Sequence, residues 1–206
     1  MKEFRRPYFR DFVNLRRHGG KSFLAPSRIF KAEHSLYFPN IHGQTLEKGV
    51  DSDRDTTPVL RGRTSIVAVF SSTWAEGQVQ SFLAKKANPD LHAALDEYKS
   101  VTGLSAPQIV RLNIETNPIK AWIVRAFFWS LRRMFAKSDW AKYFLITYKL
   151  SDEVCEATGI LNGAVGYVYL VDESCRIRWA GSGDALEEER QSLVKGLRRL
   201  VSSQEV

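Results

Sequence analysis

The chain has 206 residues, of which 44% are hydrophobic and 26% are charged. This composition is that of a globular protein and excludes a wholly disordered or fibrous chain. Two cysteines are too few for a disulfide scaffold, which favours a reducing compartment. No apolar run approaches the length of about 20 residues that crosses a bilayer, and the N-terminus lacks the apolar segment of a secretory signal.

The positive charge of the chain is concentrated at its N-terminus. The net charge is +7, and residues 1–31 carry nine Lys and Arg against two acidic residues, an excess that equals the net charge of the whole chain. We therefore expect a basic arm, residues 1–36 with a short helix over 7–18, ahead of a domain of residues 37–206. Such an arm suggests an anionic lipid, a nucleic acid or an acidic partner; the alternative is a solvated segment without a partner.

Proline and glycine punctuate residues 21–63, which predicts an irregular chain with a mobile loop over 52–57. Short apolar, β-branched runs then predict buried strands. These runs are residues 64–71, 108–115 and 166–172. Apolar spacing predicts helices over 74–86, 90–101 and 151–158.

Asn117 and Pro118 have the sequence of a helix start, and the helix that follows is expected to run to about Phe135. Cys175, Ile177 and Trp179 alternate with arginines, which predicts a half-buried strand joined to the preceding one by a tight turn. A last helix is expected to begin with a capping box formed by Asp184 and Glu187 and to carry an apolar stripe as far as Val201.

A helical connection between the first two strands predicts that they are parallel, and the last two strands are expected to form an antiparallel hairpin. The order is strand, helices, strand, helices, two strands and a final helix. This is the order of the thioredoxin-like (peroxiredoxin-like) α/β fold, a mixed sheet flanked by helices, here with a helical insertion at about 117–150.

The position of the catalytic cysteines of thioredoxin-like enzymes is taken by other residues. In that fold the reactive thiol begins the helix after the first core strand, where the helix N-terminus lowers the pKa of the thiol. The corresponding turn is residues 71–78, and Ala75 and Gln78 stand where a CxxC pair would be. The proline expected before the third core strand is also missing at residues 166–168. We therefore exclude thiol–disulfide and peroxidase activity.

Other chemistries also lack their patterns. The four histidines are scattered, and no cysteine stands at metal-ligand spacing, so we expect no metal site. Cys155 and Cys175 belong to no motif and are interpreted as small buried hydrophobic residues. We predict a protein that is not an enzyme and needs no cofactor.

Residues 119–144, the aromatic-basic segment, hold eight aromatic and six basic residues against one acid. On a helical wheel one apolar face consists of Ile119, Trp122, Ile123, Ala126, Phe127 and Met134. Its continuation consists of Ala121, Val124, Phe128, Leu131 and Phe135. A normal surface helix needs only one apolar stripe, so aromatic side chains remain after one face has packed on the sheet.

This excess is typical of an element that binds a membrane surface or a hydrophobic partner. The alternative is that the extra aromatic residues pack under residues 136–150. The candidate contacts are Trp122, Arg125, Phe127, Phe128, Trp129, Arg132 and Arg133. Nucleic acid is disfavoured, because helices rich in indole rings are not the usual platform for stacking bases.

Four segments are similar to one known family. They are GYVYLVDESCRIRWAGSGDALEEE (166–189), YFPNIHGQTL (37–46), TTPVLRGRTSIVAVFSSTWAEGQ (56–78) and YFLITYKLSDEVCEATGILN (143–162). They resemble the mitochondrial ATP synthase assembly factors called ATPase complex subunit ten, most of all the fungal members. The resemblance covers nearly all of the chain from about Pro7. Fungal members begin with a presequence and a charged segment that are not seen here, which implies a trimmed or mature form.

The resemblance implies a peripheral protein on the matrix side of the mitochondrial inner membrane. It implies a non-catalytic chaperone for the membrane (F0) sector of ATP synthase. The implied partners are newly made subunit a (subunit six in fungi) and the c ring, with anionic lipid and without nucleic acid. The alternative is a redox-inactive thioredoxin-like binding module for a soluble or acidic partner without a membrane role.

Overall fold

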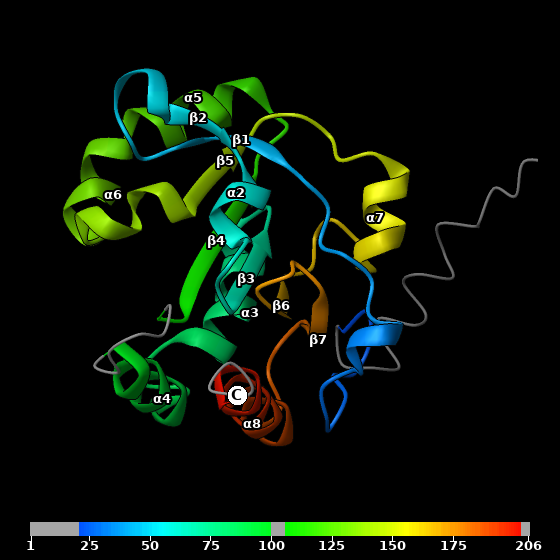
Figure 1. Ribbon diagram of the computed structural model, residues 1–206. Helices are drawn as coiled ribbons and strands as arrows, with labels where there is room; N and C mark the ends of the chain where they lie inside the picture. Colours follow the sequence, from blue (N-terminus) through cyan, green and yellow to red (C-terminus); the bar gives the residue numbers. More distant parts are fainter. Residues whose placement is uncertain (1–20, 100–105, 203–206) are drawn as a thin grey trace, which may run out of the picture.

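The computed structural model describes residues 21–99 and 106–202. The helix predicted over 7–18 lies outside these residues. The described residues form seven strands in one mixed sheet with the order β2-β1-β5-β4-β3-β6-β7 (Figure 1). The strands are β1 (His42–Thr45), β2 (Asp53–Asp55), β3 (Ser65–Phe70), β4 (Gln108–Ile114), β5 (Tyr143–Ile146), β6 (Tyr167–Val171) and β7 (Ile177–Ser182).

The centre of the sheet follows the sequence pattern closely. β3, β4 and β6 confirm the three predicted apolar strands, and β3 pairs parallel with β4 as expected from their helical connection. β3 pairs antiparallel with β6, which forms the expected hairpin with β7. Every residue of β3 is buried, because the strand has a neighbour on each side and helices on both faces. These features confirm the thioredoxin-like α/β fold.

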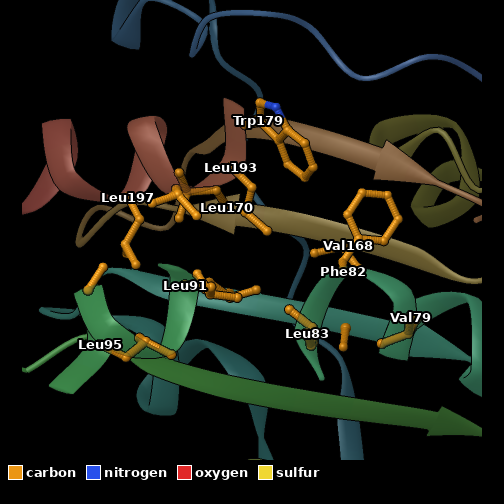
Figure 2. Packing of buried hydrophobic residues seen from close by; sticks show 14 of the residues in the cluster. Val79, Phe82, Leu83, Leu91, Leu95, Val168, Leu170, Trp179, Leu193 and Leu197 are labelled. Carbon is orange, nitrogen blue, oxygen red and sulfur yellow. The ribbon is translucent and has the colours of Figure 1, made fainter. Parts of the chain in front are cut away.

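Helices cover both faces of the sheet. On one face lie α3 (Thr73–Leu83), α4 (Pro89–Lys99) and α8 (Glu187–Ser202). Figure 2 shows the core beneath them, where Phe82, Leu91 and Leu193 pack against Leu170 and Trp179. The opposite face is covered by the short helices α2 (Thr56–Leu60) and α7 (Asp152–Thr158). α7 ends as predicted, at Gly159 in the left-handed conformation.

The prediction of an irregular chain over 21–63 is confirmed for residues 21–41, apart from one 3-10 turn and an isolated bridge, and is wrong from His42 onward. This segment contains the 3-10 helices η1 (Ala32–His34) and η2 (Gly49–Ser52), followed along the chain by β2 and α2. Residues 52–57 are not a loop, since the buried Thr56 starts α2 and its Oγ1 accepts a hydrogen bond from Ile41 N. β1 and β2 are short and polar, and β1 owes its place to pairing with β5. Such strands lack the alternation of apolar and polar residues from which a strand is predicted.

The helix expected after Pro118 ends close to the predicted Phe135, but the prediction that it is continuous is wrong. Asn117 caps it as predicted, by accepting hydrogen bonds from Ile119 N and Lys120 N. The chain then forms two helices, α5 (Pro118–Ala126) and α6 (Phe128–Met134), and the 3-10 helix η3 (Lys137–Lys142). The break falls at Phe127, whose ψ of 2° departs from helical values. The end of the aromatic-basic segment belongs to β5 and is buried.

Two details at the C-terminal end differ from the prediction. Cys175 does not open a strand but lies in the hairpin turn with a φ of 64°. α8 begins at Glu187 and not directly after Asp184. The side chain that caps the start of the helix is Glu189, whose carboxylate accepts a hydrogen bond from Leu186 N. The helix therefore starts later than the expected capping box.

A buried ion pair fastens the segment before β1 to α8. Lys21 Nζ donates to Glu189 Oε2 at 2.7 Å and to the Ser182 carbonyl at 2.8 Å, and both charged side chains are almost fully buried. Glu189 Oε1 also accepts a hydrogen bond from Ala25 N. A buried charge needs such complete pairing, because its hydration is lost.

We expect Lys21→Met to lower the free energy of unfolding by about 3 kcal/mol, since it leaves the Glu189 carboxylate buried without its cation. The matched control is Lys31→Met, which removes an equal charge from the exposed pair with Glu33. That change should cost less than about 0.5 kcal/mol. Urea unfolding of both variants checks this, and equal effects would contradict the structural role of Lys21.

Candidate functional site

The positions that carry cysteines in thioredoxin-like enzymes form a packed contact here. Ala75 is fully buried in the first turn of α3, which Ser72 caps by accepting a hydrogen bond from Ala75 N at 3.1 Å. Gln78 Oε1 accepts a hydrogen bond from Gly166 N at 2.9 Å. One side-chain amide thus joins α3 to the residue before β6, where the fold's proline was expected.

Gly166 makes this contact possible because it has no β-carbon. A Cβ at this position would lie far inside van der Waals contact of the Ala75 carbonyl oxygen and would also touch the Val79 side chain. The structure contains no cis peptide bond in its described part. The approach of the two segments therefore depends on glycine.

The two cysteines do not lie beside this contact. Cys155 lies in α7, and Cys175 is buried in the β6–β7 turn, and both are free thiols. Burial raises the pKa of the Cys155 thiol, and the nearby Asp152 carboxylate raises it further. Burial also raises the pKa of the Cys175 thiol. Both environments disfavour the thiolate, which is the reactive form.

A groove lies beside the N-terminus of α3 and has a volume of about 610 Å³. Its apolar wall comes from α5, α6 and the residues at their ends. That wall consists of Ile123, Val124, Phe127, Leu131, Met134 and Phe135. The groove also reaches Ser71 and Thr73 at the start of α3 and Arg111 and Asn113 of β4. Its volume is in the range of small-ligand and peptide side-chain sites.

Arg111 is one of four charged residues that line this groove, together with Glu76, Glu115 and Lys120. Its guanidinium carbon lies 5.0 Å from the centre of the Phe135 ring, a cation–π distance. Burial lowers the pKa of Arg111, and the carboxylates of Asp139 and Glu76 oppose that shift. Sequence analysis missed this residue, although an arginine inside the apolar run QIVRLNI was a signal for it.

The outer side of α5 and α6 presents exposed apolar side chains. We call this set the α5–α6 ridge: Ile119, Trp122, Ile123, Phe127, Trp129 and Met134. The side chains of Trp122 and Trp129 are 67% and 55% exposed. Large contiguous apolar patches are uncommon on monomers and mark interaction surfaces.

Phe128 does not belong to the ridge, although it was among the candidate contacts. Its side chain is only 5% exposed and packs edge-on against Tyr143, with the ring centres 6.5 Å apart. Val124 and Leu131, on the same side of the helices, also pack against the core. Of the two predicted apolar faces, the one that contains Val124, Phe128 and Leu131 is therefore packed against the core.

The three candidate arginines have different surroundings. Arg125 is exposed and donates through Nε to Gln44 Oε1 at 2.8 Å. Arg133 is exposed and lies 4.8 Å from the centre of the Trp129 ring. Arg132 instead donates to the backbone carbonyls of Leu46 and Glu47, at 2.6 and 3.2 Å. Arg132 therefore fastens α6 to the segment after β1, whereas the other two arginines flank the ridge.

Within the described residues, no group of three His, Cys, Asp or Glu side chains is arranged to hold a metal ion. None of the helices in that part of the chain combines the length and apolarity needed to cross a membrane.

Comparison with known proteins gave consistent matches. The family model described as ATP10 protein matches residues 1–200. The probable mitochondrial ATPase complex subunit atp10 of Schizosaccharomyces pombe is 29% identical over 202 residues, which cover 98% of this chain and 68% of that protein. The mitochondrial ATPase complex subunit ATP10 of Eremothecium gossypii is 30% identical over 197 residues, covering 95% and 68%.

A solved structure shares the fold. It is a secreted thiol-disulfide isomerase from Corynebacterium glutamicum, which aligns with a TM-score of 0.51 over 87% of this chain and 93% of its own. The two sequences are 11% identical, so the likeness concerns the fold alone.

The close approach at Gly166 can be tested with two glycines of the same loop. We expect Gly166→Ala to lower the free energy of unfolding by about 1–3 kcal/mol or more, because the new methyl group meets backbone atoms of α3. Gly163→Ala, which meets no atom, should have little effect. Thermal and urea unfolding check the difference; a tolerated Gly166→Ala would contradict the packed contact.

Proposed function

Because this chain belongs to the ATP10 protein family, we propose that it acts in mitochondria as an assembly factor of the ATPase complex. The family match spans nearly the whole chain, and the named relatives are mitochondrial ATPase complex subunits. This role needs a binding surface and does not need a reaction.

In finer detail, we propose a chaperone that lies on the matrix side of the inner membrane and binds newly made subunit a. It would hold apolar segments of subunit a until they join the c ring. The observation that carries this proposal is the α5–α6 ridge, an exposed apolar surface beside the cations of Arg125 and Arg133. Exposed indole rings with adjacent cations suit the boundary between lipid headgroups and acyl chains.

Anionic lipid is part of the proposal. Each Lys or Arg near an anionic membrane surface contributes about 1 kcal/mol of attraction. Arg125 and Arg133 lie beside the ridge, so they can reach headgroups while the Trp122 and Trp129 rings enter the interface. Lys21 is buried against Glu189 and takes no part, but the other basic residues of the arm, residues 1–36, would add to this attraction.

The proposed mode of action is binding without catalysis. Gln78 and Gly166 close the position where a thioredoxin-like enzyme exposes its thiol, and burial disfavours the thiolate of Cys155 and of Cys175. The fold then serves as a rigid platform, with α5 and α6 held on the sheet by Phe128 and Arg132.

We expect Trp122→Ala combined with Trp129→Ala to reduce crosslinking to subunit a at least tenfold. A large apolar side chain that becomes buried contributes about 1.5–3 kcal/mol, so the loss of two is enough for this effect. The chain, supplied with a mitochondrial leader, would be expressed in fission yeast lacking its own relative. Mitochondrial translation products would be labelled, crosslinked and recovered with the chain.

The matched control is Leu24→Ala with Leu36→Ala, two apolar residues that are 57% and 61% exposed. Both belong to the segment before β1, which is bonded to β7 through Leu36 O with Ile177 N and through Phe23 N with Ser182 Oγ. Figure 1 shows this blue segment away from α5 and α6. Undiminished crosslinking in the folded Trp122/Trp129 variant would place the client surface elsewhere. If the chain binds its partner without lipid, and added salt alone abolishes this binding, the alternative function as a binding module for a soluble, acidic partner would be favoured.

A further inference from the structure

Arg111 lies at the floor of the groove and not at its rim. In β4, Val110 and Leu112 are fully buried in the core on one face of the sheet, while Arg111 and Asn113 point to the other face and line the groove. Arg111 pairs in register with Tyr143 of β5, which also lines the groove. The backbone of a central parallel strand thus fixes the position of this cation.

The guanidinium has no anionic partner within the described part of the chain. It lies against the Phe135 ring, and the Glu76 and Asp139 carboxylates act on it only from beyond ion-pair distance. Glu115 is engaged elsewhere, because its Oε1 accepts a hydrogen bond from Asn117 N. Partly buried arginines are normally paired, since their donors lose water on burial.

We propose that this groove binds an apolar peptide segment of a client and that Arg111 pairs there with a single carboxylate side chain of that segment. The charge complementarity is between one partly buried guanidinium and one carboxylate. The apolar wall formed by Ile123, Phe127 and Met134 receives the neighbouring aliphatic side chains. The proposal rests on the proposed function, because the client is taken to be a protein with apolar segments.

The charges that line the groove favour a carboxylate over a phosphate headgroup. The guanidinium beside the Phe135 ring can donate two parallel hydrogen bonds to either group, so charge and not hydrogen-bond geometry discriminates between them. Glu76, Glu115 and Lys120 also line the groove, and the two carboxylates repel a group with more negative charge more strongly than a single carboxylate. The groove volume of about 610 Å³ admits a few side chains, so the segment would enter by a short stretch.

The test uses the full chain and two labelled synthetic peptides of leucine, isoleucine and alanine that differ only in a central glutamate or glutamine. We expect the glutamate peptide to bind the wild type about tenfold more tightly, as expected for a hydrogen bond to a charged group. This ratio should fall to about one in Arg111→Met. It should be partly kept in Arg111→Lys, which retains the charge and loses the planar fork.

Arg63→Met is the matched control, because it removes the same charge from an exposed residue that does not line the groove and belongs to neither proposed binding surface. It should keep the tenfold ratio. Equal binding of both peptides to the wild type would overturn the proposal without any variant, so a misfolded Arg111→Met leaves the test intact. A ratio that survives in folded Arg111→Met would overturn it as well.

Vesicles of phosphatidylcholine with cardiolipin form a second arm. If Arg111→Met loses vesicle binding while the wild type does not distinguish the peptides, the arginine binds lipid phosphate and the proposal is overturned. Failure of the proposed function gives a different result. The wild type would then crosslink to no subunit a, whatever the ratio of its affinities for the glutamate and glutamine peptides. The two readouts separate the inference from the function on which it rests.

Discussion

The Phe128 ring meets the Tyr143 ring edge-on, and this contact ties the connection after β4 back onto the sheet at β5. With Phe128 directed inward, the helical path breaks at Phe127, which is left on the outside. The neighbouring residues Phe127 and Phe128 therefore lie on opposite sides of α5 and α6, the first exposed and the second packed. Both the ridge and the apolar wall of the groove are consequences of this arrangement.

The groove and the ridge use the same two helices in different ways. Ile123, Phe127 and Met134 belong to both, since they are exposed and also line the groove. Trp122 and Trp129 belong to the ridge and do not line the groove. A hydrophobic partner could therefore touch the exposed Trp122 and Trp129 rings and the groove without a rearrangement of the helices.

The parts of the fold that sequence predicts well are those buried by their own composition. β3 and β6 are continuous apolar runs, and the start of α5 is determined locally by Asn117 and Pro118. β1 and β5 could not be predicted in the same way. β1 is polar, and β5, which follows the helix expected to end at about Phe135, was not predicted because its place depends on pairing with β4.

The candidate site was predicted only in part, for the same reason. Helical spacing separates two apolar faces, but it does not say which one packs, and only the structure shows Phe128 inside and Trp122 outside. The partner of Gln78 is Gly166, which lies 88 residues away. The depth of Arg111 likewise depends on the ring of Phe135 from a separate element. Such pairings come from tertiary packing and leave no local pattern.

The contact between Gln78 and Gly166 determines how this part of the surface responds to the redox state of its compartment. In a dithiol enzyme this part of the surface exists in two covalent states, and the ratio of those states follows the glutathione poise. An amide hydrogen bond has no second covalent state. The start of α3, which borders the groove, therefore keeps one shape whether its surroundings are reducing or oxidising. The groove beside it is therefore not altered by thiol–disulfide exchange at this position.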